Sequence, residues 1–227
     1  MNLGSRHREY LNLIGIDVWV SKDSDTAVTP QFESEQQSRR KDSLDDLRKQ
    51  VSVCTKCRLH AGRTQTVFGT GSYEADWMLI GEAPGAEEDK QGEPFVGRAG
   101  KLLTAMLASI GLEREEVFIA NILKCRPPNN RDPSADEVAA CEEYLNYQIK
   151  SIKPRLIIAL GRIAAQNLLK SDVPIGKMRG KDYEYGEEGI PVVVTYHPAY
   201  LLRSPREKRK SWQDLQLAVR KFNTIRS

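Results

Sequence analysis

The four cysteines of this sequence have the spacing of metal ligands. Cys54 and Cys57 form a C-x2-C pair, Cys125 and Cys141 follow much later, and no cysteine is left over. A C-x2-C loop brings two thiolates to one centre, and two distant cysteines complete a four-thiolate shell that suits Zn²⁺ or a [4Fe–4S] cluster equally well. Because protein ligands fill such a shell, we expect a structural site with no position open to a substrate. The alternative is two unconnected pairs of buried thiols.

Polar or turn-forming residues follow three apolar runs of strand length. The sequence Gly-Glu-Ala-Pro-Gly at 81–85 follows the first run, Asn121 belongs to the end of the second, and His197 follows the fourth. In an open α/β sheet, ligands bind outside the carboxyl ends of the strands. The sequence therefore predicts a binding or catalytic site where these three ends meet.

A basic run stands directly after the His-Pro dipeptide. Residues 203–210 hold a single acid, Glu207, and the basic residues Arg203, Arg206, Lys208, Arg209 and Lys210. Such a cluster is suited to contact phosphates, where counterion release supplies most non-specific affinity. The alternative is a solvated helix start. The position of the run beside a candidate site favours contact with phosphates.

The elements that would position these residues can be placed from hydrophobic patterns. Four apolar runs have the length of strands, and they lie at 77–80, 117–123, 156–160 and 191–196. Helix-like segments lie at 98–110, 134–152, 162–169 and 207–222. Ser134 and Glu137 form a capping-box pattern at one helix start. Because strands and helices alternate, we expect an α/β fold of three layers, α/β/α, with a central four-stranded parallel sheet.

Length and composition place this chain among ordinary globular proteins. Its 227 residues suit one domain with some extra length, and 40% are hydrophobic and 29% charged. No apolar run approaches the roughly 18 residues needed to cross a bilayer, and the N-terminus lacks the features of a secretory signal. We therefore expect a cytosolic protein without membrane contacts. The net charge of +3 does not by itself indicate nucleic acid.

The first part of the chain differs from the rest. Residues 1–45 combine an apolar stretch at 10–20 with a polar tract that lacks periodicity, which we interpret as a linker. Residues 46–227 form the expected main domain, and a helical pattern begins near Ser43. The apolar stretch is interpreted as an element that docks onto the main body; the alternative is a peptide that binds a partner protein.

From Leu44 to the C-terminus the sequence resembles the family 4 uracil-DNA glycosylases. The resemblance lies in 81–103 (GEAPGAEEDKQGEPFVGRAGKLL), 120–133 (ANILKCRPPNNRDP), 178–181 (MRGK) and 197–203 (HPAYLLR). It includes the four cysteines, which in that family ligate a structural [4Fe–4S] cluster. It implies a monofunctional hydrolase that flips uracil out of DNA and cleaves its N-glycosidic bond, starting base excision repair. It also implies a monomer in the cytoplasm, near the nucleoid, without a dissociable cofactor.

The resemblance assigns two residues to the flipped base. Phe95 corresponds to a stacking ring, although a core plug is the alternative. Asn121 corresponds to the residue that donates to uracil O4 and accepts from N3–H. Cytosine reverses both groups, so a dry site of this kind rejects it by roughly 10⁴–10⁵. For Asn121 the alternative is an amide that satisfies a turn at the strand end.

The leaving group and the water need other residues. His197 corresponds to a donor for uracil O2, where negative charge builds as the bond breaks; the alternative is a hydrogen-bonded histidine at a strand end. Backbone N–H groups around Glu82 and Ala83 would assist the same oxygen. Uracil glycosylases without a cluster carry an aspartate where this chain has Ala83. We therefore expect Glu82 or Asn130 to orient the water, with weak activation sufficing for a largely dissociative reaction.

Specificity and contact with DNA complete the set of expected roles. Glu88 stands, by similarity, where it would clash with a thymine methyl; the alternative is an exposed acid in an acidic run. Leu201 and Leu202 are suited to act as an apolar wedge that unstacks DNA. Arg203 and Arg206 would then contact the phosphates behind them.

Two rival functions differ from this expectation. A related glycosylase that traps itself covalently on uracil-DNA carries a basic, histidine-containing insertion after the second strand, but here 126–133 contains no histidine. A four-cysteine DNA-binding or redox module would not need Phe95, Asn121 and His197 on converging loops. We therefore expect an enzyme with turnover.

Overall fold

The computed structural model describes residues 30–226, so the expectations for residues 1–29, including the docking or partner-binding role of 10–20, lie outside the described residues. The chain divides into two units, Met1–Ser38 and Arg39–Ser227. Helix α2 spans Pro30–Ser52, so residues 30–43 of the tract interpreted as a linker are helical. Leu44 is fully buried. The domain organisation expected for 1–45 otherwise stays a prediction.

A six-stranded sheet lies at the centre of the second unit. Its order is β1 (Thr70–Gly71), β3 (Phe118–Asn121), β2 (Trp77–Gly81), β4 (Leu156–Leu160), β6 (Ile190–Thr195) and β5 (Tyr183–Tyr185). The four inner strands are parallel, as predicted, whereas β1 and β5 are short antiparallel edges that the sequence did not reveal. Every residue of β2, β3 and β4 is buried, as expected of parallel strands covered on both faces.

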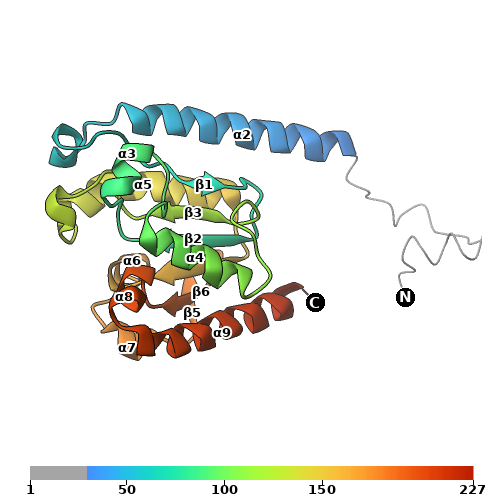
Figure 1. Ribbon diagram of the computed structural model, residues 1–227. Helices are drawn as coiled ribbons and strands as arrows, with labels where there is room; N and C mark the ends of the chain where they lie inside the picture. The colour runs from blue at the N-terminus through green and yellow to red at the C-terminus, as the bar shows by residue number, and fades with distance from the viewer. Residues whose placement is uncertain (1–29, 227) are drawn as a thin grey trace, which may run out of the picture. The chain divides into compact units, whose positions relative to one another are not determined.

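Helices cover both faces of this sheet (Figure 1). They are α3 (Ala86–Gln91), α4 (Arg98–Ala108), α5 (Ala135–Ile152), α6 (Arg162–Leu168), α7 (Ile175–Met178), α8 (Pro198–Arg203) and α9 (Lys208–Arg226). Short 3₁₀ helices are η2 (Arg58–Ala61), η3 (Pro128–Asn130) and η4 (Pro205–Glu207). The helices expected at 98–110, 134–152, 162–169 and 207–222 are all present, with ends shifted by a few residues. The helix expected to begin near Ser43 is also present, but it begins at Pro30. No helix among the described residues is long and apolar enough to span a membrane.

Two apolar clusters hold the three layers together. Alternate residues of a strand point to opposite faces, so Met78 and Ile80 join one cluster and Leu79 joins the other. The first cluster includes residues of α2 and α5, among them Leu44, Leu47, Val51, Leu145 and Ile149. The second includes residues of α4 and α9, among them Leu103, Leu107, Leu215 and Phe222. The predicted three-layer fold is confirmed.

The register of the strands decides where the polar ends meet. Gly81 pairs with Asn121, and Leu160 pairs with Thr195, two residues before His197. The carboxyl ends of the parallel strands therefore lie at one edge of the sheet, and the segments that follow them can surround one cavity.

Candidate active site

One cavity of about 400 Å³ lies at this edge. All residues expected to act on the base or the water contribute to its wall, namely Glu82, Ala83, Glu88, Phe95, Asn121, Asn130 and His197. They come from the segments after β2, β3 and β6, as the positions of the strand ends predicted. The structure thus brings together residues that are more than one hundred positions apart in the chain.

Asn121 ends β3 and is only 2% exposed. Its Oδ1 atom is buried and has no hydrogen-bond partner. A Cβ atom at Gly81 would lie 2.4 Å from this oxygen and 2.7 Å from the ring of Phe95, so glycine is what lets amide and ring approach the strand. A buried acceptor without a partner costs about 1–3 kcal/mol. Asn121 is therefore ready to accept a hydrogen bond from a ligand in the cavity.

Phe95 takes a backbone conformation that is uncommon for a large residue, with φ of 55°. Its ring lies 5.4 Å from the His197 ring, centroid to centroid, with an angle of 31° between the planes. The side chain is 7% exposed. Strained conformations of this kind persist where the surrounding structure determines them, often at ligand sites.

Glu88 holds the loop that carries Phe95. Its carboxylate accepts hydrogen bonds from the backbone N–H groups of Gly85 (3.1 Å), Val96 (3.0 Å) and Gly97 (3.1 Å). Charge-assisted bonds of this type are stronger than neutral ones. These contacts give the Glu88 carboxylate a structural role. Its expected clash with a thymine methyl stays a prediction.

His197 is the N-cap of α8, and its Nδ1 atom accepts a hydrogen bond from the Ala199 N–H at 3.1 Å. Burial, with a smaller contribution from the charge of Arg203, lowers the pKa of His197 to about 4, while Glu88 opposes the shift. The imidazole is therefore neutral at neutral pH. Since Nδ1 is an acceptor, the proton is on Nε2, which leaves an N–H donor for the cavity.

Glu82 is a carboxyl group that changes its charge near neutral pH. Burial, with a smaller contribution from the charge of Asp132, raises the pKa of Glu82 to about 7, while Arg162 opposes the shift. Arg162 donates a hydrogen bond to Asp132 at 2.6 Å. Glu82 is thus distributed between its protonated and charged forms under physiological conditions.

Asn130 lies in a loop with two consecutive left-handed residues, Asn129 with φ of 55° and Asn130 with φ of 52°. The Nε atom of Arg126 donates to Asn130 Oδ1 at 2.8 Å. Asparagine tolerates this conformation better than most residues. The loop presents Asn130 to the cavity, and Glu82 lines the same cavity.

The four cysteines line a second, small cavity together, as their spacing predicted. Arg63 donates to Cys125 Sγ at 3.1 Å, and the backbone N–H of Lys124 donates to Cys141 Sγ at 3.3 Å. Burial raises the pKa of Cys125, and it raises the pKa of Cys141 to about 11. Among the described residues, no group of three or more His, Cys, Asp or Glu is arranged to hold a single metal ion.

Lys124 connects this centre to the end of β3. Its side chain is 1% exposed, and Nζ donates to the Asn121 carbonyl oxygen at 3.0 Å and to Gln148 Oε1 at 2.6 Å. Burial lowers the pKa of Lys124 to about 8. No sequence pattern singles out this lysine, because its partners are distant in the chain or belong to the backbone.

Comparisons with known proteins identify the family. A family model described as the uracil DNA glycosylase superfamily matches residues 68–216. A type-4 uracil-DNA glycosylase of Archaeoglobus fulgidus is 48% identical over 181 residues, which cover 77% of this chain and 91% of the relative. Those of Sulfurisphaera tokodaii and Saccharolobus solfataricus are 47% and 48% identical over 182 residues, covering 77% of this chain and 83% and 84% of the relatives. The chain belongs to the type-4 uracil-DNA glycosylases.

In this type-4 uracil-DNA glycosylase, the expected wedge needs a correction. Leu201 is 1% exposed and packs in the apolar cluster with Leu215 and Phe222, so it anchors α8 and is not available to unstack DNA. Leu202 is half-buried, and Arg203 and Arg206 are exposed. The apolar position that remains for a wedge is Leu202.

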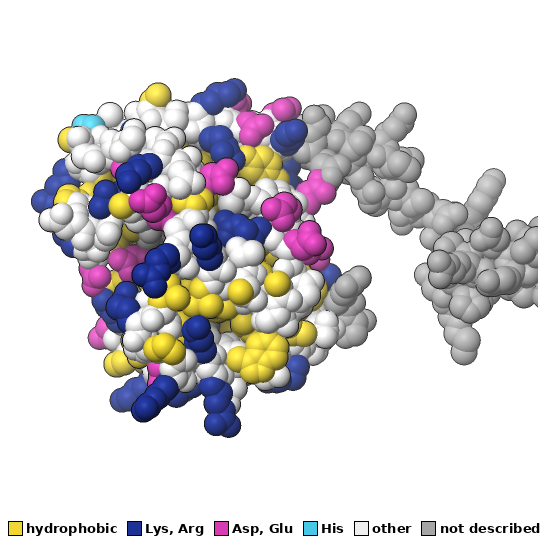
Figure 2. Space-filling view, in the orientation of Figure 1, with side chains coloured by type: hydrophobic (Ala, Val, Ile, Leu, Met, Phe, Trp, Pro, Cys, Tyr) yellow, Lys and Arg dark blue, Asp and Glu magenta, His cyan; other side chains and the backbone are white. Residues whose placement is uncertain are grey.

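Basic side chains surround this part of the glycosylase. Lys and Arg side chains gather over the area of α7, α8 and the start of α9 (Figure 2). All five basic residues of the run at 203–210 are exposed. Arg203 also lines the active-site cavity. The basic run therefore begins at the cavity itself.

Other residues of the cavity wall were assigned no role in the reaction from the sequence. They are Pro84, Gly85, Ala99, Pro127, Arg131, Asp132, Ala199 and Tyr200. Arg131 and Asp132 lie within the 120–133 motif that carries the resemblance to the type-4 glycosylases, so the motif was a signal for them. Arg162, the partner of Asp132, follows β4 and had no such signal.

Proposed function

We propose that this protein flips uracil out of DNA and hydrolyses its N-glycosidic bond, which leaves an abasic site and starts repair of deaminated cytosine. Membership of the type-4 uracil-DNA glycosylases supports both substrate and reaction. The observation that carries the proposal is the unpaired Asn121 Oδ1 beside Phe95, in the wall of a cavity at the carboxyl edge of the sheet. These are the groups that a flipped base needs for recognition and stacking.

Asn121 selects the base by its hydrogen-bonding pattern. Its Oδ1 accepts from uracil N3–H, and its amide N–H donates to O4. Cytosine carries an acceptor at N3 and a donor at C4, so both contacts would fail in a buried site. Phe95 stacks on the base, and the contacts of Glu88 to the loop keep the ring in place. Glu88 is also our candidate for excluding the thymine methyl.

His197 stabilises the departing base. As the bond between C1′ of the sugar and N1 of uracil breaks, the electron pair moves to the base and charge develops on O2. The Nε2–H of His197 donates a hydrogen bond to that oxygen, and this bond strengthens as charge builds. Because the pKa of His197 is lowered to about 4, the residue donates a hydrogen bond and transfers no proton. Backbone N–H groups at 82–83 assist.

Glu82 and Asn130 orient the water. The charged form of Glu82 accepts a hydrogen bond from the water and directs its oxygen towards C1′. Asn130 Oδ1 already accepts from Arg126, so its remaining lone pair and its amide N–H groups are available to the water. A largely dissociative transition state requires little activation of the nucleophile, so orientation is the main contribution of these two residues.

The four thiols support a [4Fe–4S] cluster as the resident group. All four line one cavity, and an arginine donates to one sulfur. Cys54, Cys57, Cys125 and Cys141 would be its ligands. When bound, such a cluster supplies a cross-link between distant segments of the chain. The hydrolysis itself uses the side chains of the other cavity.

Contact with DNA follows from the surface beside the cavity. Leu202 is suited to enter the base stack, and Arg203 and Arg206 are suited to bind the flanking phosphates. We also propose that the protein acts as a monomer in the cytoplasm, in contact with the nucleoid. Sedimentation at the protein concentration of the activity assay tests whether the protein is a monomer.

The function is tested with a labelled oligonucleotide that carries one uracil, beside a matched thymine oligonucleotide. After incubation, alkali cleaves any abasic site. We expect scission of the uracil strand alone, with many turnovers per protein molecule. A stable protein–DNA adduct on a denaturing gel would indicate covalent trapping instead, and intact uracil strands without an adduct would indicate a non-catalytic module.

A further inference from the structure

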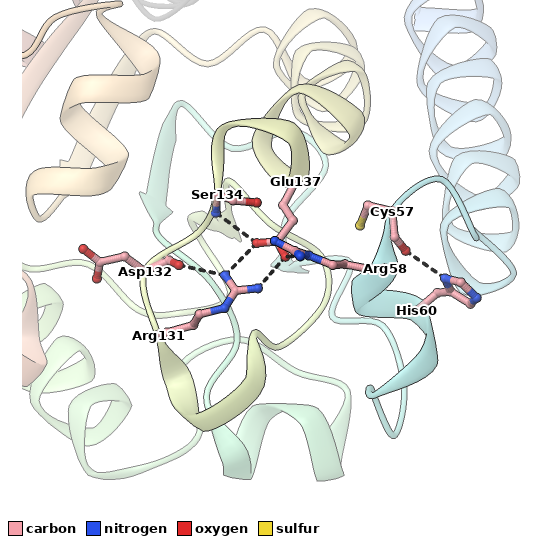
Figure 3. Close-up of polar contacts among 7 residues, drawn as sticks. All are labelled: Cys57, Arg58, His60, Arg131, Asp132, Ser134 and Glu137. Carbon is pink, nitrogen blue, oxygen red and sulfur yellow. Dashed lines mark hydrogen bonds and ion pairs between the residues drawn. The ribbon is translucent and has the colours of Figure 1, made fainter.

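Glu137 is a buried carboxylate that the steps above do not use. It lies in the first turn of α5 and is 1% exposed. Arg131 donates to it twice, at 2.8 Å and 2.5 Å, Arg58 donates from Nε at 3.2 Å, and the Ser134 N–H donates at 2.9 Å (Figure 3). The bonds from Arg131, with help from Ser134 and Arg58, lower the pKa of Glu137 to about 2 against the effect of burial. The charged Glu137 carboxylate is thus surrounded by hydrogen-bond donors from two arginine side chains and one backbone N–H group.

The two arginines belong to two different functional segments. Arg58 directly follows Cys57 and begins η2, where His60 Nδ1 bonds to the Cys57 carbonyl oxygen at 2.8 Å. Arg131 directly follows Asn130, lines the active-site cavity, and donates to its neighbour's carbonyl oxygen at 2.9 Å. Glu137 therefore joins the C-x2-C segment to the loop that carries a candidate water-orienting residue.

This loop depends on support from outside. Asn129 and Asn130 are both in the left-handed region, which asparagine tolerates better than most residues but which still costs free energy relative to the usual conformation. One end of the loop is Cys125, in the thiol centre, and the other is Arg131, held by Glu137. Both ends are thus tied to the thiol centre, one directly and one through the ion pairs.

We propose that Glu137 is a positioning residue for the glycosylase reaction, which clamps the Asn130 loop to the C-x2-C segment through Arg131 and Arg58. The inference rests on the proposed function. It also gives the thiol centre a role in catalysis at a distance: the centre fixes the segment on which the clamp is anchored. Small displacements of reacting groups are costly, since a shift of about 1 Å can slow a reaction about 10²-fold.

The chain offers a matched control on the same helix. Glu143 of α5 forms an ion pair with Lys56, which lies between Cys54 and Cys57. This pair also joins α5 to the C-x2-C segment. Neither residue lines the active-site cavity, and both side chains are about half exposed. Loss of this pair perturbs the same segment without touching the clamp.

The test compares Glu137→Gln and Arg58→Ala with Glu143→Gln and Lys56→Ala in the full chain. Wild-type excision of uracil is measured first, because its absence would overturn the proposed function and not the clamp alone. Three quantities follow for each variant: visible absorbance per protein, affinity for an uncleavable uracil-DNA analogue, and single-turnover excision rate. We expect Glu137→Gln and Arg58→Ala to retain absorbance and affinity but to excise uracil at least about tenfold more slowly.

The excision rates of the two control variants should remain within about twofold of the wild-type rate, because exposed ion pairs contribute little free energy. Adding Arg58→Ala to Glu137→Gln should slow the reaction little further, because both changes break one clamp. The Arg58 side chain is 73% exposed, so its truncation leaves no cavity. If Glu137→Gln does not fold, Arg58→Ala alone tests the clamp. Equal rates in the clamp variants and the controls, or fully additive losses, would overturn the proposal.

Discussion

His197 can assist the leaving base only as a neutral donor, because burial lowers its pKa to about 4 and the Ala199 N–H occupies Nδ1. A neutral imidazole is a weak acid, so its contribution is a hydrogen bond that is stronger in the transition state than in the ground state. The same side chain caps α8. A useful variant must therefore separate the cap from the chemistry.

His197→Asn makes this separation. Asparagine is a good N-cap residue, but its short amide does not reach the position of the imidazole Nε2–H. We expect the single-turnover excision rate to fall by about 10²–10³, the usual cost of losing one such donor, while α8 and the affinity for uracil-DNA are retained. Single-turnover kinetics and DNA titration measure the two effects. Equal losses in rate and in affinity would count against a role in the transition state.

Glu82 gives the reaction a dependence on pH. Burial and Asp132 raise its pKa to about 7, so the carboxyl is protonated below that pH and charged above it. If the charged form orients the water, kcat/KM rises with pH up to about 7 and then levels off. Glu82→Gln should remove this rise and lower the plateau by up to about 10²-fold. A pH profile that is the same in wild type and variant would exclude Glu82 from this role.

The positions of some site residues could be predicted from the sequence, and those of others could not. Asn121 and His197 could be located because each stands at the end of an apolar run, and strand ends share an edge. Leu201 was assigned to a wedge, yet tertiary packing buries it, and a short helix pattern does not show which of two adjacent leucines faces the core. The pairing of Asp132 with Arg162 joins separate loops, so no local pattern could reveal it.

Among the elements, β2 and β3 set the geometry of the proposed base-recognition site. They pair in register at Gly81 and Asn121, and the missing side chain at Gly81 is the space into which the amide and the Phe95 ring fit. The close approach of these three residues is a property of the two strands together. The absence of a side chain at position 81 is therefore important for binding.

Gly81→Ala tests this arrangement. The new Cβ would lie 2.4 Å from Asn121 Oδ1 and 2.7 Å from the Phe95 ring, so both must move. We expect uracil excision to slow by about 10²-fold or more. Gly176→Ala in α7 is the matched control, because a Cβ there meets nothing within 4 Å. Similar activity in the two variants would contradict the packing described here.

The inner strands of the sheet were predictable, whereas the edges were not. The four runs that became β2, β3, β4 and β6 are apolar, and those of β3, β4 and β6 are rich in β-branched residues, which is typical of strands buried on both faces. The edge strand β1 has two residues and β5 has three, too few to show a periodic pattern. Helix α2 begins at Pro30 in a polar tract where hydrophobic periodicity is absent, so the sequence suggested its start near Ser43.

On the scale of the whole molecule, the thiol centre joins segments that are distant in the chain. Cys54 and Cys57 precede the sheet, Cys125 follows β3, and Cys141 lies in α5. Lys124 and Glu137 extend from this centre towards the base-binding strand and the Asn130 loop. Loss of the resident group should therefore affect both stability and activity.

Cys54→Ser tests the centre with little loss of packing, because Cys54 is only half-buried. We expect absorbance near roughly 400 nm, where thiolate–iron transitions lie, to fall. The unfolding temperature should fall by at least about 4–8 °C, which corresponds to about 2 kcal/mol in a chain of this size. Spectra and thermal unfolding are measured on one sample. Unchanged values for both would remove Cys54 from the ligand set, and a colourless, metal-containing wild type would indicate zinc.

The central claim is that Asn121 reads a flipped uracil in the cavity at the carboxyl edge of the sheet. Its most direct test is the rate of excision by Asn121→Asp from matched oligonucleotides with one uracil or one unpaired cytosine. A carboxylate cannot donate to uracil O4 but can accept from the cytosine amino group. We predict that uracil excision falls by about 10²-fold or more and that cytosine excision becomes measurable, against a wild-type preference of roughly 10⁴–10⁵. An unchanged uracil rate with no excision of cytosine would contradict the account.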